Sequence, residues 1–131
     1  MSVYAEQLNT ERTKAMAEEF TVSGHFKGKS PIVKSIYDRI LVETRKFGRV
    51  IEEPKKTSIH LVNRSAFAGV IVRKNALMLN IKSDRPIEHK RVSRIEQVSR
   101  GRFHQEIKLT SLKEVDSQLI GWLLEAYALS G

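Results

Sequence analysis

The segment from Thr57 to Ile81 constrains the fold more than any other part of the chain, because it is the densest apolar stretch in the sequence. Two polar breaks, at residues 63–65 and 73–75, divide it into three runs that each have the length of a β-strand. Strands joined by such short turns have to be antiparallel, since parallel neighbours need long crossovers. The segment therefore predicts three consecutive strands of a β-meander.

A first helix is predicted over residues 31–47. Ser30 supplies an N-cap and Pro31 a first helical residue, where a missing backbone N–H costs little. Apolar residues then recur at spacings of three and four, and Gly48 supplies the C-cap. This pattern is typical of an amphipathic helix that packs on a sheet.

A second helix is predicted over residues 112–129, where Ser111 and Glu114 fit a capping box. Weaker strand patterns, with less regular alternation, lie on both sides of the central segment. These additional strands are expected at residues 49–56, 91–98 and 103–109.

Together these elements predict an α+β fold: an antiparallel meander sheet of five or six strands with two amphipathic helices packed on one face, plus an N-terminal helix. We assign residues 23–131 to a single α+β domain and residues 1–22 to an N-terminal helical segment with a thin apolar stripe. Residues 21–29 are expected to form a loop. A chain of 131 residues is long enough to bury one such core.

The middle run of the central segment, residues 66–72, is apolar at every position except Gly69 and does not alternate. Such a strand is typical of burial on both faces, whereas its alternating neighbours predict burial on one. The helices can cover only one face, so the other face needs an N-terminal helix, a second subunit or a ligand. The residues from which this need follows are Val62, Ala68, Val70, Val72 and Met78.

The composition bounds the cellular setting. The chain has no cysteine, which excludes disulfides and thiol chemistry and suits a reducing compartment. Its N-terminus lacks the apolar core of a signal peptide, and no apolar run approaches the roughly 18 residues of a transmembrane helix. We therefore expect a soluble, cytoplasmic protein with no membrane partner.

The charge raises the expectation of an anionic partner, because 23 lysines and arginines against 15 aspartates and glutamates give a formal charge of +8. Many of the basic residues lie between Lys82 and Lys108, and Arg100 and Arg102 flank a glycine at an expected hairpin tip. Side chains at such a tip could reach a phosphate backbone. The alternative is that the charge serves solubility only.

Two of the four histidines, His60 and His104, are expected on the sheet face away from the helices, together with Arg94, Glu96, Glu106 and Lys108. Such a cluster could perform acid–base chemistry or hold an anion. The alternative is a solvated face with cross-strand charge pairs. The candidate anion-binding or ligand-binding residues are Lys56, His60, Arg64, Arg94, Arg100, Arg102 and His104.

No motif indicates catalysis, a metal or a cofactor. The histidines lack a metal-ligand spacing such as HExxH, and no serine lies in a Gly-x-Ser-x-Gly turn. We assign no catalytic residue, no metal site and no cofactor. A glycine inside a strand calls for a physical explanation. Gly69 either makes room in the core for a bulky neighbour such as Trp122 or Phe103, or lets a ligand approach the backbone. We favour the first explanation, core packing.

Five short segments of the chain form a recognisable pattern, mostly at apolar and turn positions. They are Phe26-Lys27-Gly28-Lys29-Ser30-Pro31, Lys56-Thr57-x-Ile59, Arg64-x-x-Phe67-Ala68-Gly69-Val70, His104 with Ile107-x-Leu109-Thr110-Ser111, and Trp122-Leu123-x-x-Ala126-Tyr127. On these motifs, about residues 25–128 resemble a small bacterial and archaeal domain of unknown function, which also occurs as the C-terminal module of predicted transport proteins. The resemblance implies a fold but no catalytic residue, cofactor or substrate.

Two functional hypotheses follow. The first is a non-enzymatic binding module whose basic surface engages a nucleic acid or an acidic protein surface. The alternative is a small-molecule-binding or enzymatic domain with a pocket that uses His60, Arg64 and His104. A polar, histidine-containing concavity would favour the second hypothesis, and a convex basic stripe the first. We also expect a homodimer, or an N-terminal segment folded over the open side of the sheet.

Overall fold

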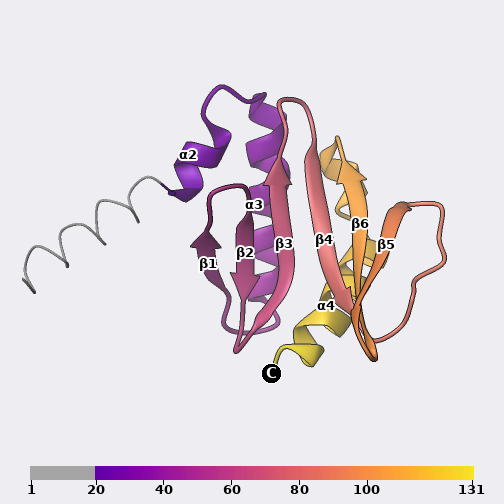
Figure 1. Cartoon of the computed structure of the whole chain (residues 1–131). Helices are drawn as coiled ribbons and strands as arrows, with labels where there is room; N and C mark the ends of the chain where they lie inside the picture. Colours follow the sequence, from indigo (N-terminus) through magenta and orange to yellow (C-terminus); the bar gives the residue numbers. More distant parts are fainter. Residues whose placement is uncertain (1–19) are drawn as a thin grey trace, which may run out of the picture.

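The computed structural model describes residues 20–131, so the predicted N-terminal helix lies almost entirely outside the described part of the chain. Within that part, one antiparallel sheet of six strands carries its two long helices on a single side (Figure 1). This confirms the predicted α+β fold. None of the helices in residues 20–131 is long and apolar enough to cross a bilayer. In chain order the elements are α2 (Val22–Phe26), α3 (Pro31–Arg45), β1 (Ile51–Pro54), β2 (Ile59–Val62), β3 (Ala66–Val72), β4 (Leu77–Ser83), β5 (Val92–Ser99), β6 (Arg102–Leu109), the 3-10 turn η1 (Leu112–Glu114) and α4 (Ser117–Leu129).

The sheet follows the predicted meander from β1 to β4 and then changes order. Its strands lie in the order β1-β2-β3-β4-β6-β5, so β6 pairs with β4 and β5 takes the edge. The burial of the two strands explains this order. β6 presents Gln105, Ile107 and Leu109 to the interior, whereas residues 93–99 of β5 are all exposed. The strand with the apolar face therefore takes the position that the helices can cover.

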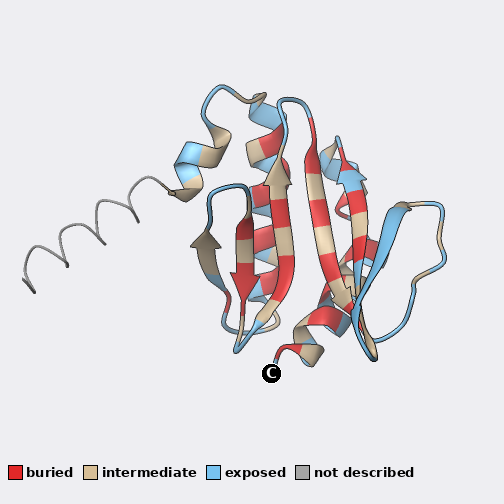
Figure 2. Cartoon of the chain, in the orientation of Figure 1, coloured by how far each residue is buried: buried red, intermediate tan, exposed pale blue. Residues whose placement is uncertain are grey.

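The middle strand β3 is buried on one face only, so the prediction of burial on both faces is wrong. Ala68 and Val70 are buried beneath the helices, while Gly69 and Ile71 are half-buried on the other side. Figure 2 shows the resulting bands of buried and intermediate residues along β3 and β4. This alternation could not be predicted from the sequence, because residues on both faces of β3 are apolar or glycine. Because the helices already cover Ala68, Val70 and Val72, these residues do not call for a second subunit or an N-terminal helix.

Helix α3 begins and packs as predicted, with Pro31 in its first turn. The Ser30 hydroxyl, however, donates to Oδ1 of Asn75 and does not cap the helix. Tyr37 is fully buried and donates to Oε2 of Glu52 at 2.6 Å, which ties α3 to β1. Burial, followed by this hydrogen bond, raises the pKa of Tyr37 well above its ordinary value. The face of α3 toward the sheet consists of Val33, Ile36, Tyr37, Ile40, Leu41 and Thr44.

Two segments differ from their predicted form. Residues 22–26, expected in a loop, form the short helix α2, because Oγ1 of Thr21 accepts a hydrogen bond from the N–H of Gly24 at 3.0 Å. The capping box of Ser111 and Glu114 is present, but it closes the 3-10 turn η1. Helix α4 begins later, where Asp116 acts as its N-cap and accepts from the N–H of Leu119 at 3.0 Å.

Glu114 holds the turn before α4 together through a single oxygen. Its Oε1 accepts from the backbone N–H groups of Thr110 and Ser111 at 2.8 and 3.0 Å and from both of their hydroxyls. Burial alone would raise the pKa of Glu114, but these hydrogen bonds outweigh it and the pKa is lowered. A lowered carboxyl pKa stabilises the fold above the ordinary value of about 4.3, and that stability is lost as pH falls through the lowered value.

Replacing Glu114 with alanine is therefore expected to reduce the free energy of unfolding by about 1 kcal/mol at neutral pH. The difference in the free energy of unfolding between wild type and variant should decrease as acid protonates Glu114 in the wild-type protein. Urea denaturation at neutral pH and in steps down to about pH 3 measures both effects. Glu88→Ala is the control, since Glu88 is exposed and makes no hydrogen bond within residues 20–131. An equal loss for both variants would contradict the role of Glu114.

Candidate functional site

A pocket of about 220 Å³ lies on the side of the sheet opposite α3 and α4. We call this side, which carries His60, Gly69, Asn80 and His104, the open face; it is turned toward the reader in Figure 1. The pocket is lined by Thr57, Ser58, His60, Ala66, Phe67, Ala68, Gly69, Ile71, Asn80, Lys82 and His104.

Gly69 lines this pocket and lies between His60 of β2 and Asn80 of β4 in the strand register. A Cβ atom placed on Gly69 would lie 3.8 Å from Cδ2 of His60 and 4.0 Å from Cβ of Asn80, which are ordinary contact distances. Its backbone has no positive φ. Neither Trp122 nor Phe103 fills the space, so the expectation that Gly69 serves core packing is wrong. The missing side chain leaves the pocket open.

Three strands bring polar side chains to the pocket. His60 comes from β2 and His104 from β6, and Lys82 of β4 is the register partner of His104. Within the described residues, hydrogen bonds to imidazole groups involve His25 and His89 only. The imidazoles of His60 and His104 therefore remain available to a ligand as donors or acceptors.

Among the described residues that line the pocket, Lys82 is the one lysine or arginine. Its Nζ donates to Oγ of Ser65 at 3.2 Å, and no carboxylate in residues 20–131 lies within ion-pair distance of it. Burial, and then the positive charge of Arg102, lowers the pKa of Lys82. A partly desolvated ammonium beside a second cation is a position where a bound anion would relieve repulsion.

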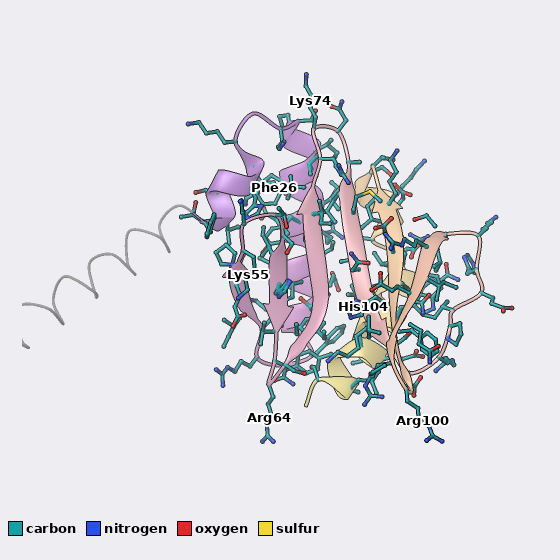
Figure 3. All side chains as sticks on the ribbon, viewed as in Figure 1. Phe26, Lys55, Arg64, Lys74, Arg100 and His104 are labelled. Atoms are coloured by element: carbon teal, nitrogen blue, oxygen red, sulfur yellow. The ribbon has the colours of Figure 1, made fainter. Side chains whose placement is uncertain are left out.

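The other sequence-predicted candidates do not converge on the pocket. Arg64 and Arg100 lie in turns at one end of the sheet and point away from it, whereas His104 lies over the sheet (Figure 3). Lys56 is exposed in the turn after β1, next to Thr57 of the pocket. Arg102 contributes its charge near Lys82, although its Nη1 donates to the carbonyl of Gly101 at 2.7 Å.

The open face as a whole carries mixed charge. Arg94 pairs with Glu96 at 3.2 Å on β5, and in the register Arg94 lies opposite Glu106 of β6. This places the predicted cluster of His60, His104, Arg94, Glu96, Glu106 and Lys108 on one face, but as alternating charges across the sheet. In the described part of the chain no group of three histidine or acidic side chains could hold a metal ion.

Four polar residues that line the pocket were not among the candidates predicted from the sequence: Thr57, Ser58, Asn80 and Lys82. Lys82 was visible in the sequence only as one of many basic residues. The alternation of β4 was the available signal, because it places Asn80 and Lys82 on the face opposite Leu79 and Ile81.

Comparison with known proteins gives a family but no characterised relative. No curated protein and no solved structure matches this chain. A family model described as "Domain of unknown function (DUF5655)" matches residues 22–130, which include both long helices and all six strands. The chain therefore belongs to the DUF5655 family of domains of unknown function.

Proposed function

We propose that this protein binds a small organic anion in the open-face pocket. The observation that carries the proposal is the position of Lys82, whose ammonium borders the pocket without a carboxylate partner in residues 20–131. Charge-assisted hydrogen bonds from an ammonium to a carboxylate or phosphate oxygen are among the stronger polar contacts in proteins. His60 and His104 lie on either side of the same hollow and supply further donors.

The lining and size of the pocket limit the ligand. Gly69 and Ile71 of β3 give the pocket an apolar part, and donors from His60, Lys82 and His104 also line it. At about 220 Å³ it is smaller than the roughly 300–1,000 Å³ typical of sites for drug-sized molecules. The fitting class is a small molecule with one acidic group and a short apolar part, such as a carboxylate or a phosphate ester.

A surface for nucleic acid is less well supported. Arg64 and Arg100 point away from the sheet at its end, and Glu96 and Glu106 lie among the basic residues of the open face. A polyanion needs a continuous basic track, because each phosphate along it carries a charge. The open face does not present one.

Isothermal titration with inorganic phosphate, acetate and a panel of small organic acids tests the proposal. Lys82→Met should weaken binding about 10- to 100-fold, since a hydrogen bond to a charged group is worth roughly 1.5–3 kcal/mol. Lys108→Met is the matched control, because Lys108 is exposed on the same face of β6 and does not line the pocket. Equal weakening by both variants, or a steep salt dependence with duplex DNA, would favour a diffuse polyanion surface instead.

Filling the pocket at Gly69 is a second test. Gly69→Val should abolish ligand binding, because the added methyl groups occupy the space between His60 and Asn80. It should also raise the free energy of unfolding by about 0.5–1 kcal/mol, since glycine is unfavourable inside a strand. Titration and urea denaturation measure the two effects, with Gly69→Ala as a smaller step. A valine variant that binds like wild type would exclude this site.

A further inference from the structure

The two edges of the sheet are protected to different extents. β1 has only four residues, ends at Pro54, which has no backbone N–H, and is contacted by α2. Nε2 of His25 lies 2.8 Å from the carbonyl oxygen of Lys55, just beyond the strand. Short edge strands, proline and covering segments all discourage pairing with another chain. β5 has eight residues, contains no proline and forms the opposite edge.

The outer edge of β5 has no partner in the described residues. Backbone-to-backbone hydrogen bonds of residues 93–99 run only within the ladder with β6. Each of these residues is exposed, Ile95 by 43% and Val98 by 45%. The loop that leads into β5 is held against α4, through Arg85 to Glu125 at 3.3 Å and His89 on Trp122. An exposed strand edge with apolar residues is a site for strand addition.

The sequence of β5 is complementary to itself. In an antiparallel pair centred on Ile95, Ile95 meets its own copy, and Arg94 meets Glu96 of the other chain twice. Ser93 lies opposite Gln97 in the same register. Residues opposite one another share a face, and Arg94 and Glu96 both lie on the open face. The irregularities of β5 fall outside Arg94–Gln97, so the central part of the strand is regular.

Other registers are disfavoured by charge. A shift by two residues in one direction places Arg94 opposite Arg94, and in the other direction it places Glu96 opposite Glu96. Like charges directly opposite each other destabilise a strand pair. A shift by one residue places Ile95 opposite a charged residue and mismatches the faces.

We propose that two copies of this chain pair through β5, antiparallel and centred on Ile95, and join their sheets into one. The two-fold axis runs perpendicular to the sheet, so both open faces point the same way and the two pockets share one surface. One strand from each copy forms a small interface, below about 1,200 Å², so we expect a dissociation constant in the micromolar range. This pairing does not depend on what the pocket binds.

Sedimentation velocity over a wide concentration range tests the pairing with charge variants. Arg94→Glu gives a chain with two acidic residues at positions 94 and 96, and Glu96→Arg gives a chain with two basic ones. Each variant alone should dimerise at least about tenfold more weakly than wild type, because like charges then oppose each other. An equimolar mixture of the two should dimerise as well as wild type, and so should the double swap Arg94→Glu/Glu96→Arg.

The control is Glu53→Arg on β1, the opposite edge, which should leave dimerisation unchanged. Hydrogen exchange should show slower exchange of amides within residues 94–97 as protein concentration rises, with no such change in β1. A wild-type protein that stays monomeric up to millimolar concentration would overturn the proposal. So would a dimer that is equally stable in both single variants, because its contact would lie elsewhere.

Discussion

Replacing Phe67 with alanine is expected to lower the free energy of unfolding by about 3–5 kcal/mol, the largest effect of any substitution considered. The side chain is fully buried, and its ring lies edge-on to Tyr127 of α4, with the centroids 5.2 Å apart. The ring of Tyr127 in turn packs against that of Phe47, with the ring centroids 5.7 Å apart. The substitution would leave a cavity where the sheet meets α4 and the segment after α3.

The position of Phe67 depends on an irregularity in the sheet. Leu61 pairs with Ala68 and Val62 pairs with Ala66, so Phe67 is the extra residue of a β-bulge. A bulge redirects the side chains beside it, which lets this ring turn toward α4. Urea denaturation measures the loss, with Phe103→Ala as a control because Phe103 is only half-buried. A midpoint for Phe67→Ala equal to that of wild type would contradict this packing.

Replacing Gly48 with alanine is expected to cost about 2–4 kcal/mol, from backbone strain and a steric clash together. Gly48 has φ +151°, a conformation that residues with a side chain rarely adopt, and an added Cβ would lie 2.6 Å from the hydroxyl oxygen of Tyr127. That hydroxyl donates to the carbonyl of Arg49 at 2.9 Å. The clash would therefore displace a ring held by its own hydrogen bond.

Gly101 provides a matched control for this substitution. Its φ is +70°, but no atom lies within 4 Å of a Cβ added there. Gly101→Ala should therefore cost only the backbone component, about 1–2 kcal/mol. In thermal or urea unfolding, Tyr127→Phe should relieve part of the loss in Gly48→Ala, because it removes the clashing oxygen. Strictly additive losses in the double variant would show that the hydroxyl contact is unimportant.

Local patterns in the sequence were sufficient for most of the elements. The spacing of apolar residues in 31–47 predicted the buried face of α3, and the polar breaks at 63–65 and 73–75 located β2, β3 and β4. Both patterns depend on backbone periodicity, which is a local property. The same alternation placed His60 and His104 together on the open face.

The candidate site needed information that local patterns lack. Alternation shows which face a residue occupies but not which strands are neighbours, so it could not bring Lys82 beside His104. It could not show that the space beside Gly69 is empty, because that depends on side chains of β2 and β4. The charge of Arg64 and Arg100 predicts a role in anion binding, but both residues lie in turns at the end of the sheet, away from the pocket.

The sequence by itself determined the fold class, the two helices and the strands, because each follows from periodicity and turn residues within a few positions. Only the tertiary structure decided the strand order, the one-sided burial of β3 and the pocket. β6 and not β5 lies beside β4, and Ile107 and Leu109 of β6 belong to the same hydrophobic core as Leu123 of α4. Such a core joins residues far apart in the chain. In the sequence, Gly69 is one more position of an apolar run. The strand register places it between His60 and Asn80, and this shows that it belongs to the pocket.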